Sequence, residues 1–290
     1  MVMLNDHLKR RFGCKVYKIA LNGGFTCPNR DGSIDTRGCI FCSEGGSGEF
    51  AGSPEKSVTE QIEDGKRLVA EKNRSGKYIA YFQAYTGTYA PYDRLKKLYT
   101  QAIGHPDVVA LSIATRPDCL PDETIDLLSE LNMIKPVWVE LGLQTIHERT
   151  AEYIRRGYDL SVYDEAMGRL RKAGVEVITH MIIGLPGETP EDMLETVRYI
   201  CDSGAAGIKL QLLHILRGTD LEREYRDGKI GTLSEDEYID ILKKCVEIIP
   251  DDVVIHRMTG DGDKRILVAP LWSGNKKHVI NRIRNEVLRP

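Results

Sequence analysis

Short apolar runs alternate with amphipathic segments along most of this chain, and that alternation limits its possible folds more than any other feature. Six runs rich in β-branched and aromatic residues have the length of buried strands: 15–21, 78–83, 108–114, 137–143, 175–183 and 207–213. Segments with a helical period lie between them: 55–72, 92–103, 122–133, 161–172 and 189–202. Apolar strands that alternate with helices form parallel sheets. We therefore predict an α/β fold of six βα units.

The number of units leaves two architectures open. Six units are too few for a closed eight-stranded barrel, so the sheet is either doubly wound or an open partial barrel, and periodicity does not distinguish them. After the sixth run we expect two helices, an apolar run and a C-terminal helix that cover the open edge: 219–226, 235–249, 253–256 and 276–288. The pattern predicts one domain over 1–290, with a core at 15–215 and an extension at 216–290.

Composition excludes several classes of protein. A chain of 290 residues that is 41% hydrophobic can bury a sizeable core. Its longest apolar runs, such as 108–114, fall far short of the roughly 20 residues that a membrane span needs. The first residues lack the apolar region of a secretory signal. We expect a cytoplasmic protein that does not enter a membrane.

The charge is distributed unevenly along the chain. The net charge is −3, but residues 1–18 carry +4 and residues 256–290 carry +5, so the middle is strongly acidic. Basic ends of this kind are compatible with binding to a polyanion such as RNA. Ordinary solvated helix faces would give the same count, and the sequence does not choose between these explanations.

Three of the seven cysteines form a cluster. Cys27, Cys39 and Cys42 follow the first predicted strand with C-x11-C-x2-C spacing, in a loop rich in Gly, Pro, Asn and Asp. Thiolates favour iron–sulfur clusters or zinc. A closed zinc site needs a fourth ligand, and Cys14 lies before the strand, roughly 20 Å of extended chain away. The spacing therefore favours a [4Fe–4S] cluster with one open iron, with zinc or no metal as alternatives.

Several motifs occur together and in order: TCPNRDG, GCIFC, YFQAYTGTYAP, TRPDCL, ELGLQT, GLPGE and HRMTGDG. Together they resemble the radical S-adenosylmethionine (SAM) superfamily, and within it the elongator- and methylthiotransferase-like enzymes that carry GFTCPNRDG. The long first gap departs from the usual C-x3-C-x2-C. The resemblance implies an open partial TIM-type (β/α)6 barrel and a [4Fe–4S] cluster on the three cysteines. SAM would bind the open iron and be cleaved to a 5′-deoxyadenosyl radical.

The same resemblance assigns cofactor-binding roles to residues near the strand ends. They are Phe41 beside Cys42, Gln83 and Thr86 at the methionyl amino group, Glu140 and Gln144 facing SAM, Arg156 at the SAM carboxylate, and Gly184, Leu185 and Leu213 along adenine. Simpler explanations exist for some of them. An ion pair would explain Glu140. The helix dipole would explain Arg156, and core packing would explain Leu213. A carboxylate in the apolar run of Glu140 requires a partner in either case.

Titratable residues at the predicted active face are candidates for catalysis. His180 lies in the fifth predicted strand, and His256, Arg257 and Asp261 end the apolar run at 253–256. Arg116 and Asp118 follow the third strand. These groups are of the types used for substrate recognition or proton transfer. A satisfied core histidine and loop ion pairs are the alternatives.

The resemblance also implies a substrate and partners. Relatives indicate modification of the C5 side chain of the tRNA wobble uridine, with a flavodoxin- or ferredoxin-like electron donor. A radical SAM enzyme acting on a small molecule or peptide is one alternative. A non-enzymatic zinc or iron–sulfur protein is another, and it predicts no response to SAM.

Overall fold

The structure of the protein is a computed structural model that describes residues 1–260 and 262–288. Its ten strands are β1 (Val2–Met3), β2 (Tyr17–Leu21), β3 (Tyr78–Phe82), β4 (Val108–Thr115), β5 (Val137–Gln144), β6 (Glu176–Ile183), β7 (Gly207–Leu212), β8 (Ile215–Leu216), β9 (Val254–Arg257) and β10 (Leu267–Ala269). Its α-helices are α1 (Leu4–Phe12), α2 (Val58–Val69), α3 (Tyr92–Gly104), α4 (Asp122–Asn132), α5 (Glu148–Tyr153), α6 (Leu160–Lys172), α7 (Pro190–Asp202), α8 (Asp220–Arg226), α9 (Glu235–Ile248) and α10 (Lys276–Arg282). None of these helices is long and apolar enough to cross a bilayer.

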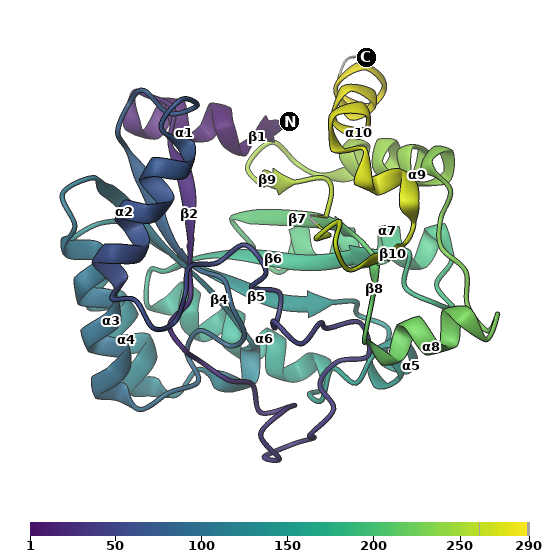
Figure 1. The fold of residues 1–290 in the computed structure, drawn as a ribbon, viewed down its shortest axis with the longest axis horizontal. Helices are drawn as coiled ribbons and strands as arrows, with labels where there is room; N and C mark the ends of the chain where they lie inside the picture. The colour runs from purple at the N-terminus through teal and green to yellow at the C-terminus, as the bar shows by residue number, and fades with distance from the viewer. Residues whose placement is uncertain (261, 289–290) are drawn as a thin grey trace.

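The main sheet is an open, curled half-barrel. Its strand order is β1-β9-β7-β6-β5-β4-β3-β2, and all neighbouring strands are parallel. From β2 to β7 each crossover moves one strand along in the same direction, as in a barrel and unlike a doubly wound sheet. In the described chain β1 and β2 form the two edges, so the barrel stays open (Figure 1). This confirms the predicted α/β open barrel.

The sheet is larger than predicted, because the apolar run at 253–256 does not simply cover an edge. It forms β9, which pairs in parallel with β7, and the N-terminal β1 pairs with β9. Helix α1 was not predicted from the sequence, because its residues are mostly polar or charged. Leu8 of α1 packs against Trp138 and Ile178 and closes the amino-terminal end of the barrel.

Residues inside the barrel form layers, since alternate residues of a strand face the same side. In β5 Trp138 belongs to the apolar layer at the amino-terminal end, Glu140 lies in a polar layer, and Gly142 lines a cavity at the carboxyl ends of the strands. The largest apolar cluster fills the space between the sheet and its helices. The loop with the cysteines runs past the carboxyl ends of the strands and lines this cavity.

Candidate active site

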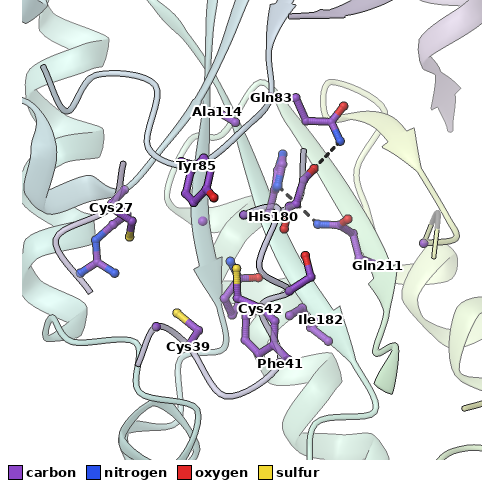
Figure 2. A pocket seen from close by; sticks show the side chains of 18 of the residues that line it. Cys27, Cys39, Phe41, Cys42, Gln83, Tyr85, Ala114, His180, Ile182 and Gln211 are labelled. Carbon is purple, nitrogen blue, oxygen red and sulfur yellow. Dashed lines mark hydrogen bonds between the residues drawn. The ribbon is translucent and has the colours of Figure 1, made fainter. Parts of the chain in front are cut away.

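A cavity of about 270 Å³ lies at the carboxyl ends of the barrel strands. Cys27, Cys39 and Cys42 line its outer part, and residues of β3 to β7 and β9 line its inner part. Figure 2 shows His180 and Gln211 on the wall beyond the cysteines. Ligand sites in parallel α/β folds occupy this position. The three thiols and the barrel interior therefore share one space.

Short turns bring the three thiols to this space (Figure 2). The carbonyl of Cys27 accepts hydrogen bonds from the N–H groups of Arg30 (2.8 Å) and Asp31 (3.1 Å). The N–H of Cys42 donates to the carbonyl of Cys39 at 2.9 Å. Each cysteine is thus fixed by a turn of the backbone, and the C-x2-C spacing forms one of these turns.

Side chains then anchor the cysteine loop to the barrel. The Asn29 amide, which is 1% exposed, donates to the carbonyl of Arg155 at 2.8 Å and to Cys39 Sγ at 3.5 Å. The Arg30 guanidinium donates to the carbonyls of Cys42 (2.9 Å) and Ser43 (2.6 Å). These bonds anchor the loop to the turn after α5 and close it on itself.

The chemistry and spacing of the thiols fit an iron–sulfur cluster better than a single ion. The three sulfurs are not all within 4.8 Å of one another, whereas thiolates bound to one zinc at about 2.3 Å lie closer together. In a [4Fe–4S] cluster each thiolate binds a different iron, which needs wider spacing. Burial raises the pKa of Cys39 to about 11 and also raises the pKa of Cys42. Cluster binding must therefore release protons from these thiols.

The segment after Cys42 docks on the end of β3. Gln83 Nε2 donates to the carbonyl of Ser47 at 2.7 Å, and Tyr85 Oη donates to the carbonyl of Glu44 at 2.6 Å. A side chain on Gly46 would overlap the Tyr85 ring, so only glycine permits this approach. Gln83 and Thr86 line the cavity, as the predicted cofactor role requires. The Gln83 amide, however, already donates a hydrogen bond to the loop at Ser47.

Most of the residues predicted to bind the cofactor line the cavity: Phe41, Gln83, Thr86, Glu140, Gln144, Arg156 and Leu213. Gln144 has a positive φ of 70°, and its buried Oε1 has no hydrogen-bond partner. Strained backbone and an unpaired buried acceptor together are typical of a binding site. This orphan oxygen is available to a donor group of a bound cofactor.

Two predicted cofactor residues do not reach the cavity wall. Gly184 and Leu185 are absent from its lining, and Leu185 packs in an apolar cluster with Ile154 and Leu213. The turn that follows β6 faces Leu233, which a Cβ on Gly184 would contact at 3.0 Å. The prediction of an adenine contact for these two residues is not supported by their position.

Arg156 lines the cavity, but its guanidinium is engaged by the protein. The side chain is 2% exposed and donates to the carbonyls of Thr145 (2.7 Å) and Tyr158 (3.0 Å) and to the Glu148 carboxylate (3.1 Å). A clamp on a carboxylate would need the same donors. The geometry favours a role in holding the turns that flank α5.

Glu140 has the partner that its apolar strand requires. The carboxylate is fully buried; its Oε1 accepts from Lys18 and from Ser112 Oγ (2.6 Å), and its Oε2 accepts from Lys209 and from His180 Nε2 (2.7 Å). Burial alone would raise the pKa of Glu140, but the two lysines hold it well below its ordinary value. Glu140 is therefore an anion that joins four side chains.

His180 lies on the cavity wall as predicted. Burial lowers its pKa to about 4, so the imidazole is neutral near pH 7. With Nε2–H donated to Glu140, the bare Nδ1 accepts from Gln211 Nε2 at 3.3 Å, which assigns the tautomer (Figure 2). This arrangement favours a positioning role over proton transfer.

The other two described catalytic candidates, Arg257 and His256, lie in different parts of the barrel. Arg257 lines the cavity. His256 does not, because it lies at the amino-terminal end of the barrel against Gly207, with its ring 6.3 Å from that of Trp138. The predicted catalytic role of His256 is not supported by this position. Asp261 lies outside the described residues.

Arg116 and Asp118 form the loop ion pair that was the alternative to a catalytic role. Arg116 donates to both Asp118 oxygens at 2.9 and 2.7 Å and to the carbonyl of Arg156 at 2.8 Å. Arg116 nevertheless lines the cavity beside the cysteines. Its positive charge thus remains close to the thiol sites.

Several cavity residues were not predicted from the sequence, among them Tyr81, Lys209, Gln211 and His214. A usable signal existed for Lys209 and Gln211, which occupy alternate positions in the otherwise apolar GIKLQL run. This is the argument that singled out Glu140. His214 follows β7, and its buried Nε2 has no partner.

Comparison with known proteins identifies the family. The sequence model of the radical SAM superfamily matches residues 33–200, and that of the radical SAM C-terminal domain matches residues 205–289. The chain therefore belongs to the radical SAM superfamily, which uses a [4Fe–4S] cluster and SAM. Among its relatives, the uncharacterized protein YtqA of Bacillus subtilis (strain 168) is 48% identical over 98% of this chain and 88% of YtqA.

Two more distant similarities bear on the fold and the substrate. The tRNA uridine(34) acetyltransferase of Methanocaldococcus jannaschii is 28% identical over 58% of this chain and 31% of that protein. The solved structure of Elp3 from Methanocaldococcus infernus superposes with a TM-score of 0.70 at 18% identity, over 94% of this chain and 64% of that one. The second similarity shows the shared fold.

When bound, a [4Fe–4S] cluster and SAM would supply the radical chemistry of this superfamily. Cys27, Cys39 and Cys42 would hold the cluster, and the cavity walls would bind and orient SAM and the reacting group. The closed amino-terminal end of the barrel keeps bulk water from entering there. The protein's own contribution is thus positioning and exclusion of water.

Proposed function

We propose that this radical SAM enzyme modifies the C5 side chain of the wobble uridine of tRNA. The similarity to a tRNA uridine(34) acetyltransferase carries this proposal, and it extends over 170 residues, or 58% of this chain. The chain matches only 31% of that relative. The proposal therefore concerns the radical step on the uridine and does not include acetylation.

The basic ends contribute less to tRNA binding than their charge indicates. Arg11 of α1 pairs with Glu176 at 2.8 Å, and Arg282 of α10 pairs with Asp236 (2.8 Å) and Glu286 (2.7 Å). Helices α1 and α10 also lie on the side of the molecule away from the cysteine loop (Figure 1). We expect the phosphate contacts to come mainly from residues around the mouth of the cavity.

The test uses anaerobic protein reconstituted with iron and sulfide, SAM, a flavodoxin or dithionite as electron donor, and tRNA from cells that lack this gene. We expect 5′-deoxyadenosine formation to rise when tRNA is added, and nucleoside mass spectrometry to show a changed uridine at position 34. Cys42→Ala is the control and should abolish both signals.

Unchanged nucleosides and no effect of tRNA on 5′-deoxyadenosine formation would contradict the tRNA proposal. If 5′-deoxyadenosine still forms, the substrate is a small molecule or peptide. If SAM produces neither cleavage nor a thermal shift, the site is a structural metal centre instead.

A further inference from the structure

The deepest part of the cavity holds a lysine with an unusual environment. Lys209 lies in the middle of β7, is 6% exposed and points into the barrel, where it lines the cavity. Its Nζ donates to Glu140 and lies 3.3 Å from Tyr81 Oη and 4.8 Å from the centre of the Tyr81 ring. The inner end of the cavity therefore presents the primary amine of Lys209 to any molecule that enters it.

Two lysines share one carboxylate at this position. Lys18 approaches Glu140 from β2 on the Oε1 side and does not line the cavity, whereas Lys209 approaches from β7 on the Oε2 side and does. One carboxylate fully compensates one ammonium group only. One of the two lysines can therefore lose its proton while the other stays paired with Glu140. Lys209 is the lysine that a ligand in the cavity can reach.

The elements packed around Lys209 bring titratable or charged groups toward it: Lys18 of β2, Tyr81 of β3, Glu140 of β5, His180 of β6, and His256 and Arg257 of β9. Burial first, and then the charges of Lys18 and Arg257, outweigh Glu140 and lower the pKa of Lys209 to about 7. His180 is neutral and donates its only proton to Glu140. Lys209 is thus the lining group that exchanges a proton near neutral pH.

We propose that Lys209 is a catalytic residue that accepts a proton from the substrate in the cavity, with Glu140 as the positioning residue that pairs with the resulting ammonium. The proton passes from an N–H or O–H of the substrate to Nζ, the substrate loses one unit of positive charge, Lys209 gains one, and no electron moves. General-base groups work best when their pKa is close to the working pH. This inference rests on the proposed function for the identity of the substrate.

The first measurement does not depend on the substrate. The holoenzyme is treated anaerobically with short pulses of formaldehyde and cyanoborohydride at pH 5.5 to 10, and methylation of each lysine is read by peptide mass spectrometry. Formaldehyde is small enough to enter the cavity, and only the unprotonated amine reacts. We expect half-maximal labelling of Lys209 near pH 7, whereas an ordinary lysine side chain in water reacts with a midpoint of about 10. A Lys209 midpoint near 10 would overturn the proposal.

The second measurement follows the modified tRNA nucleoside as a function of pH. Wild-type turnover should rise through pH 7, and Lys209→Arg should lower it by on the order of 100-fold or more and remove that rise, because a guanidinium keeps its charge but does not release its proton. Iron content and the thermal shift with SAM show that the variant is folded and loaded. Lys209→Arg with wild-type turnover and pH profile would refute the role.

The two hypotheses fail in different ways. If the wild-type protein leaves tRNA unchanged while Lys209 labels near pH 7, the tRNA proposal fails and the reactive amine stands. If tRNA is modified while Lys209 labels near pH 10, the tRNA proposal stands and the inference about Lys209 fails.

Discussion

Glu140 shows how one residue can set both the stability and the chemistry of the barrel interior. Its carboxylate holds Lys18 and Lys209 in place and fixes the tautomer of His180. A buried ion pair is weak evidence for stability as a whole, but removal of one partner leaves buried charge without compensation. The effect of a substitution at Glu140 is therefore much larger than the net contribution of the ion pairs.

We expect Glu140→Ala to lower the free energy of unfolding by about 3–5 kcal/mol at pH 7, because it leaves the buried Lys209 and the partly buried Lys18 without a carboxylate. Urea denaturation followed by circular dichroism measures this change. Glu71→Ala, at an exposed position, is the control and should stay within about 0.5 kcal/mol. Since the folded pKa of Glu140 is lowered, its contribution is present above its ordinary pKa and is lost as pH falls through the folded value. Equal stability of the two variants at pH 7 would contradict this account.

At the scale of elements, the cysteine loop depends on bonds to the turn after α5. Asn29 donates to the carbonyls of Arg155 (2.8 Å) and Arg156 (3.3 Å), and the N–H of Ile40 donates to the carbonyl of Ile154 at 3.1 Å. The loop is long, and its closure has an entropic cost that these bonds offset. The positions of the thiols therefore depend on a segment more than 100 residues away in the sequence.

We expect Asn29→Ala to lose iron, with clearly fewer than the roughly four atoms per chain of a complete cluster. Iron and sulfide assays after reconstitution and gel filtration measure the loss. Asn132→Ala is the matched control, since Asn132 also donates to a backbone carbonyl (Gly174, 3.1 Å) but lies far from the loop. It should lower stability by about 1 kcal/mol and keep the full iron content. Full iron in Asn29→Ala would show that the loop orders without this anchor.

At the scale of the whole molecule, the two ends of the chain complete one sheet. Val254 and Ile255 of β9 pair with Gly207 and Ile208 of β7, and β1 pairs on the other side of β9. Helix α9 packs Tyr238, Ile239 and Leu242 into the same core as the barrel helices. We therefore propose that the C-terminal extension folds together with the barrel.

We expect a chain that ends at residue 215 to lose cooperative unfolding, because β7 becomes an exposed apolar edge and the core loses the α9 face. Urea denaturation followed by two probes tests this, with non-coincident transitions or aggregation as the expected result. A chain that ends at residue 275 retains β9 and α9 and should unfold in one transition at lower urea. A single sharp transition of the 215-residue chain would show that the core folds independently.

The sequence by itself determined the parallel α/β class and the need of Glu140 for a buried partner, and it placed three cysteines in one loop as a predicted metal site. Each of these follows from local information, namely apolar periodicity, ligand spacing and the cost of burying a charge. The resemblance of its motifs added the cofactors, and the family match bears this out.

Only the tertiary structure decided which strand-end residues face the cavity. In a parallel sheet both faces are buried, so the sequence shows alternation but not which face is the interior. That is why Gly184 and Leu185 lie outside the cavity wall, while Lys209, Gln211 and His214 belong to it. The addition of β9 to the sheet was hidden for a related reason, since four apolar residues after a long connection do not reveal their neighbour. Strand pairing is a long-range contact, and it sets both the edge of this sheet and the contents of its active site.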